Sequence, residues 1–310
     1  MFRVVLFLFV FACGQSYAQD NQYSKVKVWL LDNSIEELSQ LSVAVDHGSH
    51  KKNVWLITDL SLSEIEEVQA AGFTVDVLIA DVKAHYRQQN VKPTKKSTKA
   101  QNCGLSGFEI PLVQNYSNGS MGGFFTYQEM LENLDSMASK YPNLISARAP
   151  IDTFLSIENR PIEWLRISSN PASSFSKPAI LYTALHHARE PGSMQQLIYY
   201  MWYVLENYES NEELQYVVDN VEMYFVPCIN PDGYVYNELT DPNGGGMHRK
   251  NRRNVGTNNK GVDLNRNYSY EYGGAGTSGN PNSETYKGTG PFSEPETQAM
   301  QWLSENIGFT

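Results

Sequence analysis

Two stretches near the start of the chain alternate between inward-facing and polar residues with a period of two. The repeating positions are Val26, Val28 and Leu30 in the first stretch and Val54, Leu56 and Thr58 in the second. This period is typical of half-buried β-strands, and the run at residues 73–79 predicts a third strand. Ser34 with Glu37, and Ser61 with Glu64, have the spacing of a capping box and predict two helices between the strands.

Together these elements predict a small α+β module over residues 24–90, with Gly72 ending its second helix. No cluster of side chains suited to catalysis lies in this stretch of sequence. The pattern therefore favours a folding or inhibitory module resembling a propeptide.

The second half of the chain alternates predicted strands and helices. Strands are expected at residues 160–168, 178–185 and 221–227, and helices after Thr126, over 192–208 and from a Ser293 cap toward Asn306. The inward face of the first helix is formed by Met130, Leu134, Met137 and Tyr141. The order predicts an α/β fold, in which helices cover both faces of a mixed, partly parallel sheet. The Pro231 and Gly233 pair after the 221–227 strand predicts a tight turn.

Residues 91–103 are polar and basic and lack hydrophobic periodicity, so they predict an exposed linker. An ordinary connector and a site of propeptide release remain equal alternatives. If the linker is cleaved there, the secreted protein begins between Lys96 and Gly104; if it is not, the protein begins at Gln19.

Residues 1–18 begin with the basic Arg3, continue with a short apolar run and end with Ser16-Tyr17-Ala18, in which the first and last residues are small. This three-part pattern is typical of a cleavable signal peptide. The apolar run is too short to span a bilayer. We therefore expect a secreted or periplasmic protein, cleaved after Ala18, without stable membrane insertion. A lipid-modified Cys13 is the alternative, but the bulky Phe11 disfavours it.

The formal net charge of the chain is −10, and removing Arg3 with the signal lowers it to −11. An acidic chain is a poor partner for nucleic acid, so nucleic-acid binding is not expected. Of the cysteines, Cys103 and Cys228 remain after cleavage at Ala18, which is too few for a disulfide scaffold. Cys228 lies in an apolar run and is expected to be a buried free thiol.

His187 and Glu190 are three positions apart where a predicted strand ends and a helix begins. Imidazole nitrogen and carboxylate oxygen are zinc ligands, although a lone pair with this spacing is weak evidence. Further motifs follow in the order Asn230-Pro231-Asp232-Gly233-Tyr234, Arg249, Gly261-Val262-Asp263-Leu264-Asn265-Arg266-Asn267, Ser283-Glu284-Thr285-Tyr286 and Ser293-Glu294-Pro295-Glu296. From Gly122 onward, this series resembles the zinc metallocarboxypeptidase family.

The resemblance implies a single Zn²⁺ ion held by His187 and Glu190, with peptide or protein C-termini as substrate. It implies that Arg249 stabilises the oxyanion and that Asn265 and Arg266 hold the substrate carboxylate. Arg189 is carried over as a contact to substrate upstream of the scissile bond, with a salt bridge equally open. The neighbouring His186 competes as a ligand, but its register favours a structural role.

In the family, the third zinc ligand is a later histidine and the general base a still later glutamate, whereas no histidine follows His248 in this chain. Glu305 has the position of a solvated helix residue rather than a base. We therefore expect residues 104–310 to be the N-terminal part of the catalytic domain, binding zinc poorly and lacking activity alone. Two alternatives are an inactive protein that binds peptide carboxylates and a related zinc amidohydrolase or deacylase.

Overall fold

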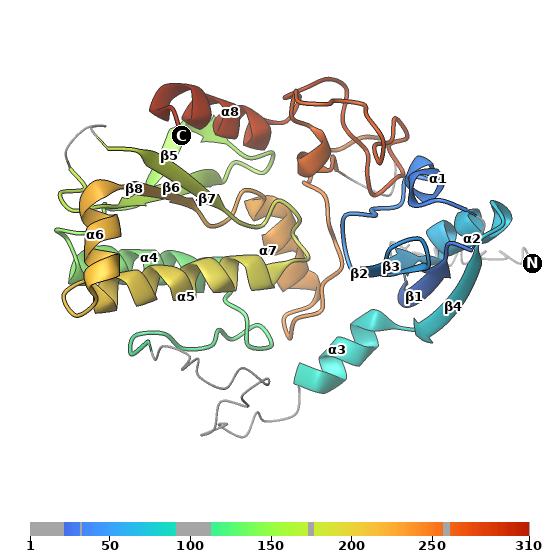
Figure 1. The fold of residues 1–310 in the computed structure, drawn as a ribbon, viewed down its shortest axis with the longest axis horizontal. Coiled ribbons are helices and arrows are strands. Elements are labelled where there is room, and N and C mark those ends of the chain that lie inside the picture. Colours follow the sequence, from blue (N-terminus) through green and yellow to red (C-terminus); the bar gives the residue numbers. More distant parts are fainter. Residues whose placement is uncertain (1–21, 32, 91–112, 173–176, 257–260, 310) are drawn as a thin grey trace, which may run out of the picture.

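The computed structural model describes residues 22–31, 33–90, 113–172, 177–256 and 261–309. In these residues the chain forms two units side by side, each built around one four-stranded sheet (Figure 1). The predicted signal peptide 1–18, the predicted linker 91–103 and Cys103 lie outside the described residues. No helix in the described ranges is long and apolar enough to cross a membrane.

The first unit, here called the N-terminal module, contains the predicted strands and capped helices. Its elements are β1 (Tyr23–Trp29), α1 (Ile35–Gln40), β2 (Ser49–Lys51), β3 (Trp55–Ser61), α2 (Leu62–Ala70), β4 (Thr74–Ile79) and α3 (Val82–Asn90). The strands pair antiparallel in the order β2-β3-β1-β4. Both capping boxes are formed as predicted, because each serine accepts the N3 amide and each N3 glutamate accepts the serine amide.

One face of the module's sheet packs against α1 and α2. Val26, Val28 and Leu56 are fully buried there, together with Leu38 of α1 and Val68 of α2. The period-two alternation in the sequence therefore corresponds to one buried and one exposed sheet face.

The second unit, here called the C-terminal unit, contains the predicted strands and several further elements. They are α4 (Tyr127–Lys140), β5 (Ala149–Leu155), β6 (Pro161–Ile167), β7 (Ala179–Thr183), α5 (Pro191–Asn207), α6 (Glu212–Asn220), β8 (Glu222–Val226), α7 (Pro231–Thr240), the 3-10 turn η1 (Leu264–Arg266) and α8 (Pro295–Ile307). The sheet order is β5-β6-β8-β7, with β7 and β8 parallel and the other pairs antiparallel. The prediction of a mixed, partly parallel sheet is confirmed.

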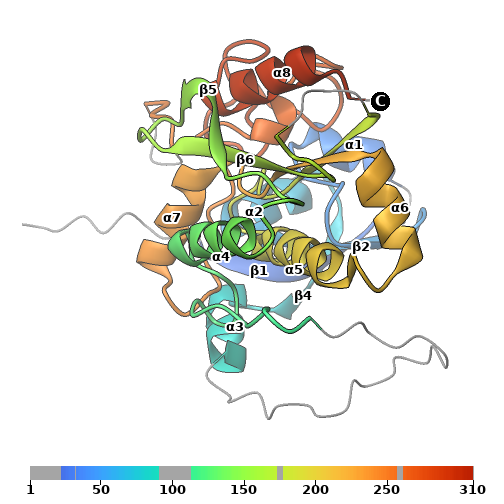
Figure 2. The same ribbon diagram turned by 90° about the vertical axis from the view of Figure 1, so that its left-hand side faces the viewer.

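Helices cover both faces of this sheet, with α4 and α5 on one side and α8 on the other (Figures 1 and 2). Leu165 of β6 and Phe225 of β8 are buried in the core shared with α4 and α5. Ile162 and Val226, on the opposite face of the same strands, are buried in the core shared with α8. Alternate residues of each strand thus fill two different cores, which fixes the strand register.

Two local predictions in the C-terminal unit are wrong. Pro231 and Gly233 do not form a tight turn but lie in the first turn of α7, because Asn230 caps this helix by accepting the Gly233 amide at 3.0 Å. Ser293 does not cap α8, since the N-cap is Glu294 and no side chain caps the helix. The Ser293 hydroxyl instead donates to Glu294 Oε1 at 2.9 Å.

Candidate metal centre

His187 and Glu190 lie in the turn between β7 and α5, where sequence reasoning placed them. Leu185 has a φ of 54°, which reverses the chain after the strand, and the Glu190 amide donates to the His187 carbonyl at 3.1 Å. Pro191 then occupies the first turn of α5. A left-handed leucine is strained, and such strain is concentrated at sites where side chains must be aimed.

The two side chains meet directly, because His187 Nδ1 and Glu190 Oε1 are 2.9 Å apart. The opposite ring nitrogen of His187, Nε2, lies 3.1 Å from the buried Asp263 Oδ1. A carboxylate at this position fixes the orientation of an imidazole whose other nitrogen faces a metal. Glu190 keeps 39% of its side chain exposed, whereas His187 is buried.

Arg249 is buried beside this pair and is held by Asp263. Its Nε and Nη2 atoms donate to Asp263 Oδ2 at 3.2 and 2.8 Å, and its Nη1 is 3.9 Å from Glu190 Oε1. Burial raises the pKa of Asp263, but Arg249 and His187 outweigh this effect and hold the pKa far below its usual range. Asp263 is therefore the anion that compensates the buried Arg249.

His47, from the N-terminal module, reaches the same point, and sequence reasoning missed it. Its Nε2 lies 3.2 Å from His187 Nδ1 and 3.2 Å from Glu190 Oε1. Burial and the nearby Arg249 lower the pKa of His47, which favours the neutral imidazole. No sequence signal marked His47, because it lies 140 residues from His187 and in a segment without a motif.

Donor atoms of His47, His187 and Glu190 all lie within 4.8 Å of one another. Two imidazole nitrogens and one carboxylate oxygen are a donor set that zinc accepts. The electrostatics of Glu190 agree with this donor set. Burial raises the pKa of Glu190, but His187, His47 and Arg249 together outweigh burial and lower the pKa. A charged carboxylate beside two imidazole rings suits a divalent cation.

Asn265 and Arg266 lie in η1, next to Asp263. Arg266 Nη2 donates to Asp46 Oδ2 of the N-terminal module at 2.9 Å, and its Nε donates to the Gly276 carbonyl at 3.0 Å. Burial raises the pKa of Asp46, but the hydrogen bond and charge of Arg266 outweigh it and lower the pKa. The guanidinium thus already binds a carboxylate, supplied by the module. Asn265 is exposed, and its backbone amide donates to Asp263 Oδ1 at 3.0 Å.

The remaining candidates take structural contacts. Arg189 is 3.7 Å from Glu284, and its guanidinium lies over the ring of Tyr23 at 5.3 Å, so the salt-bridge alternative describes its position here. His186 lies 2.9 Å from the Tyr268 hydroxyl, and burial lowers its pKa to about 4. Glu305 is exposed on α8.

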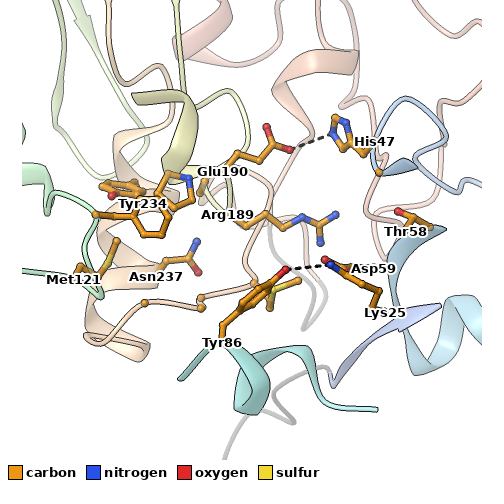
Figure 3. Close-up of a pocket in the computed structure, with 18 of the residues that line it drawn as sticks. Lys25, His47, Thr58, Asp59, Tyr86, Met121, Arg189, Glu190, Tyr234 and Asn237 are labelled. Atoms are coloured by element: carbon orange, nitrogen blue, oxygen red, sulfur yellow. Dashed lines mark hydrogen bonds and ion pairs between the residues drawn. The ribbon is translucent and has the colours of Figure 1, made fainter. Parts of the chain in front are cut away.

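A cavity of about 740 Å³ lies between the two units. His47, Arg189 and Glu190 line it, as do Met121 and Tyr234 of the C-terminal unit. Figure 3 shows His47 and Glu190 approaching from opposite sides, each from a different unit. A cavity of this size beside the donor atoms has the volume of a site for a small ligand.

The fold and the site together define an α/β protein with a metal-ligand cluster at the carboxyl end of a strand in a partly parallel sheet. Residues 130–309 match the family described as zinc carboxypeptidase, and the chain belongs to this family.

Named relatives agree with this family. Metallocarboxypeptidase A of Arthroderma otae is 30% identical over 251 residues, covering 79% of this chain and 58% of that protein. Carboxypeptidase A4 of Mus musculus is 26% identical over 302 residues, covering 93% of this chain and 66% of that protein. The chain therefore spans less than two thirds of the length of these relatives.

Solved structures show the same fold. Carboxypeptidase A from Helicoverpa armigera superposes with a TM-score of 0.69 at 21% identity, covering 93% of this chain and 68% of the other. A thrombin activatable fibrinolysis inhibitor structure has a TM-score of 0.63 at 23% identity, covering 93% of this chain and 69% of the other.

Proposed function

We infer that this chain is part of a zinc-dependent metallocarboxypeptidase precursor, exported to the periplasm or the medium, that hydrolyses C-terminal peptide bonds. The observation that carries the inference is the 2.9 Å approach of His187 and Glu190 beside the Arg249–Asp263 pair, in a member of the zinc carboxypeptidase family. The signal-like residues 1–18 support export.

His187 and Glu190 are the residues that would hold zinc, with Asp263 orienting the imidazole. Zinc in such a site polarises a carbonyl and lowers the pKa of a bound water. Arg249 Nη1 is buried and has no hydrogen-bond acceptor among the described residues, so it is available to a developing oxyanion. This nitrogen is 3.9 Å from Glu190 Oε1, close to where the scissile carbonyl is expected.

Arg266, with Asn265, is the proposed clamp for the C-terminal carboxylate of the substrate. Its present partner, Asp46, supports the assignment because this partner is itself a carboxylate at hydrogen-bonding distance. Arg189 is proposed as a contact to upstream substrate residues, which requires that it leave Glu284 or use the face of its guanidinium.

The N-terminal module is proposed to be an inhibitory propeptide. It places Asp46 on the carboxylate clamp and His47 on the ligand pair, so it occupies the two places that a substrate must reach. Release at the 91–103 linker would then open the site.

The test is the release of C-terminal amino acids by the complete gene product after cleavage of the linker. Activity should disappear with a chelator, return with zinc, and be lost in His187→Ala and Glu190→Ala. Glu305→Ala, at an exposed position of α8 in the C-terminal unit, should retain activity. Absence of zinc-dependent release from the complete product rejects the function. The 310-residue chain by itself is expected to be inactive, and robust turnover would contradict this.

Two other functions make different predictions. A catalytically inactive carboxylate-binding protein would bind C-terminal peptides through Arg266 without cleaving them, and Arg266→Ala would abolish the binding. A zinc deacylase would hydrolyse free N-acyl amino acids faster than peptides. The Arg266–Asp46 contact is the observation that keeps the binding protein as the second candidate.

A further inference from the structure

The cavity between the two units has an apolar side and a polar side. On the C-terminal unit it is lined by apolar and aromatic side chains, here called the apolar wall: Met121, Phe124, Tyr234 and Met247. Apart from Ile57 and Tyr86, the module lines the cavity with glycine and polar residues, among them Lys25 and Asp59, whose charged atoms are 3.7 Å apart. Figure 3 shows Met121 and Tyr234 on one side of the cavity and Lys25 and Asp59 on the other.

A module with this polar surface is a poor match for the apolar wall, because apolar side chains are stabilised by leaving water for an apolar environment. The wall therefore suits an apolar occupant other than the module. We propose that it is a subsite for substrate side chains upstream of the scissile bond, and that the enzyme prefers peptides with apolar residues there. This inference rests on the proposed function, which supplies the peptide and its direction.

The direction of the substrate places its upstream residues at this cavity. Glu190 and Arg189 line the cavity, whereas the proposed clamp residues Asn265 and Arg266 are not among the described residues that do. A peptide whose terminal carboxylate is on the clamp and whose scissile carbonyl is beside Glu190 has to continue away from the clamp. Its next residues therefore enter the space that Arg189 and the apolar wall enclose.

The docked module follows the same path. Asp46 accepts a hydrogen bond from Arg266 at 2.9 Å, His47 lies 3.2 Å from Glu190, and Ser49 lines the cavity. One short segment of the module thus passes from the clamp, beside the ligand pair, to the cavity. A substrate that takes the first two places therefore has its upstream residues at the third.

Two members of the wall are presented by a tight turn that is tied to α5. The Met121 amide donates to the Phe124 carbonyl at 3.0 Å, and the Phe124 amide donates to the Met121 carbonyl at 3.1 Å. Residues paired in this antiparallel way have their side chains on the same face. Gln195 of α5 donates to the Gly123 carbonyl and accepts the Phe125 amide, both at 3.2 Å. The helix that begins directly after the proposed ligand pair therefore also positions the wall.

The polar groups beside the wall are used within the protein. The Tyr234 hydroxyl donates to the Phe125 carbonyl, which leaves the ring as its contribution to the wall. Asn237 also lines the cavity, but its side chain donates to the His248 carbonyl at 2.9 Å and accepts the His248 amide at 3.0 Å. The wall therefore favours apolar side chains over polar ones, because a polar side chain would lose water there without gaining these groups as partners.

Met247 is the member of the wall whose backbone is fixed on both sides while its side chain is only half-buried. On one side, Asn237 holds both backbone groups of His248. On the other, a Cβ at Gly246 would lie 2.7 Å from Asn237 side-chain atoms, so only glycine fits. The methionine side chain itself is flexible and polarisable and adapts to apolar groups of different shape. The preference is therefore for a class of side chain rather than for one residue.

The experiment uses the complete gene product after cleavage of the linker, with two N-acetylated tetrapeptides that share their C-terminal residue. The three upstream residues are leucine in one peptide and serine in the other. The kcat/KM should be about 10-fold or more higher for the leucine peptide, because burying even one leucine side chain is worth about that factor. Calorimetric titration of the protein freed of metal should show the same preference in Kd, without hydrolysis.

Met247→Ser should lower the leucine-to-serine ratio by about 4-fold or more, since each buried methylene contributes about this factor. Met247→Leu should keep the ratio. Leu239→Ser, at an exposed position of α7, is the matched control and should also keep it. A general disturbance of the nearby Arg249 lowers both rates and leaves the ratio unchanged. If Met247→Ser does not fold, Met247→Gln, which is polar but of nearly the same length, should show the loss.

The outcomes separate the subsite from the proposed function. Equal kcat/KM and equal Kd for the two peptides, or a ratio unaltered in a folded polar variant of Met247, would overturn the subsite. Zinc-dependent hydrolysis of both peptides would then leave the proposed function intact. If neither peptide is hydrolysed, but the leucine peptide binds more tightly and a polar residue at Met247 removes this preference, the hydrolytic function fails and the apolar wall stands as a peptide-binding surface.

Discussion

Among single residues, Asp263 organises the candidate centre. Its two carboxylate oxygens accept hydrogen bonds from Arg249, from His187 and from the Asn265 amide. It is fully buried, so its charge is stabilised by these partners rather than by water. The same carboxylate thereby orients the proposed metal ligand, neutralises the proposed oxyanion donor and fixes the turn that carries the proposed substrate clamp.

We predict that Asp263→Asn destabilises the chain and weakens metal binding. The buried Arg249 would lose its counter-charge, which typically costs about 3–5 kcal/mol of unfolding free energy. Zinc affinity should fall about 10–100-fold, because His187 loses its orienting partner. Urea denaturation of the metal-free chain and zinc titration measure the two effects. Asp152→Asn, at an exposed position, is the control. Equal stability of both variants would contradict the argument.

The site residues that lie in recognisable sequence motifs were predictable from the sequence. His187, Glu190 and Arg249 lie close together in the structure, in agreement with the motif order, although their chemical roles remain predictions. His47 was not predictable, because its contact with His187 depends on how two separately folded units pack. Asp263 stood inside a quoted motif, but its function follows only from the burial of Arg249 between distant loops.

Among the elements, the ends of β7 and β8 position the centre through Asn230, the N-cap of α7. Its side-chain amide donates to the Lys250 carbonyl at 3.0 Å and to the His186 carbonyl at 3.3 Å, while its oxygen accepts the Gly233 amide. One buried side chain therefore caps a helix and joins the His187 loop to the Arg249 loop. The end of β8 and the start of α7 are therefore held together with both loops of the candidate centre by the side chain of Asn230.

Asn230→Ala should therefore lower the free energy of unfolding by more than the loss of an ordinary helix cap does. Removing a cap typically costs about 1 kcal/mol, and leaving buried carbonyls without a donor adds about 1–3 kcal/mol. Asn211, the N-cap of α6, accepts two amides at a more exposed position and gives the matched variant Asn211→Ala. We expect unfolding free energies lower by about 2–4 and about 1 kcal/mol, respectively, in urea denaturation. Equal losses would mean that Asn230 only caps.

The start of α8 should make stability depend on pH through Glu296. Burial raises its pKa from 4.5 to about 7, so the folded chain holds a proton that the unfolded chain has released between these values. Stability therefore falls as pH rises from 4.5 to 7, by about 3 kcal/mol in total. Glu296→Gln should remove this dependence and be more stable than the unaltered chain at pH above 7. Glu305→Gln, exposed on the same helix, should leave the pH profile unchanged; a profile identical in all three proteins would refute the prediction.

Helices and strands that carry a capping box or a clear hydrophobic periodicity were predicted from the sequence. Elements that lack both were not predicted. The three capping boxes at Ser34, Ser61 and Thr126 specify helix starts through contacts three residues apart. The exposed strand β2 and the mostly exposed β5 carry little periodicity, because few of their side chains enter a core. Helix α7 was missed because Pro and Gly in its first turn have the appearance of a turn, although proline suits the start of a helix.

In the whole molecule, charged contacts help to join the two units. Lys83 and Arg87 of α3 both pair with the buried Asp241, and Asp46, which lines the cavity, pairs with Arg266. The more exposed of these pairs, that of Asp46 with Arg266, is weakened by salt and can be exchanged for contacts with water. The interface is thus suited to a module that first covers the site and is later released.

The last prediction concerns the carboxylate that the module places on the clamp. Asp46→Ala should increase the affinity of the chain for an N-acylated dipeptide with a free C-terminus, because the Arg266 guanidinium no longer has to exchange one carboxylate for another. A partly exposed ion pair is worth about 1 kcal/mol, so an increase of about 5-fold is expected in calorimetric titration. Asp59→Ala is the matched control, since Asp59 lines the same cavity but pairs with Lys25 inside the module. Arg266→Ala should abolish binding in either background. If Asp46→Ala and Asp59→Ala bind the dipeptide equally, Asp46 does not compete for the clamp, and the module must block the site by its bulk and by His47 alone.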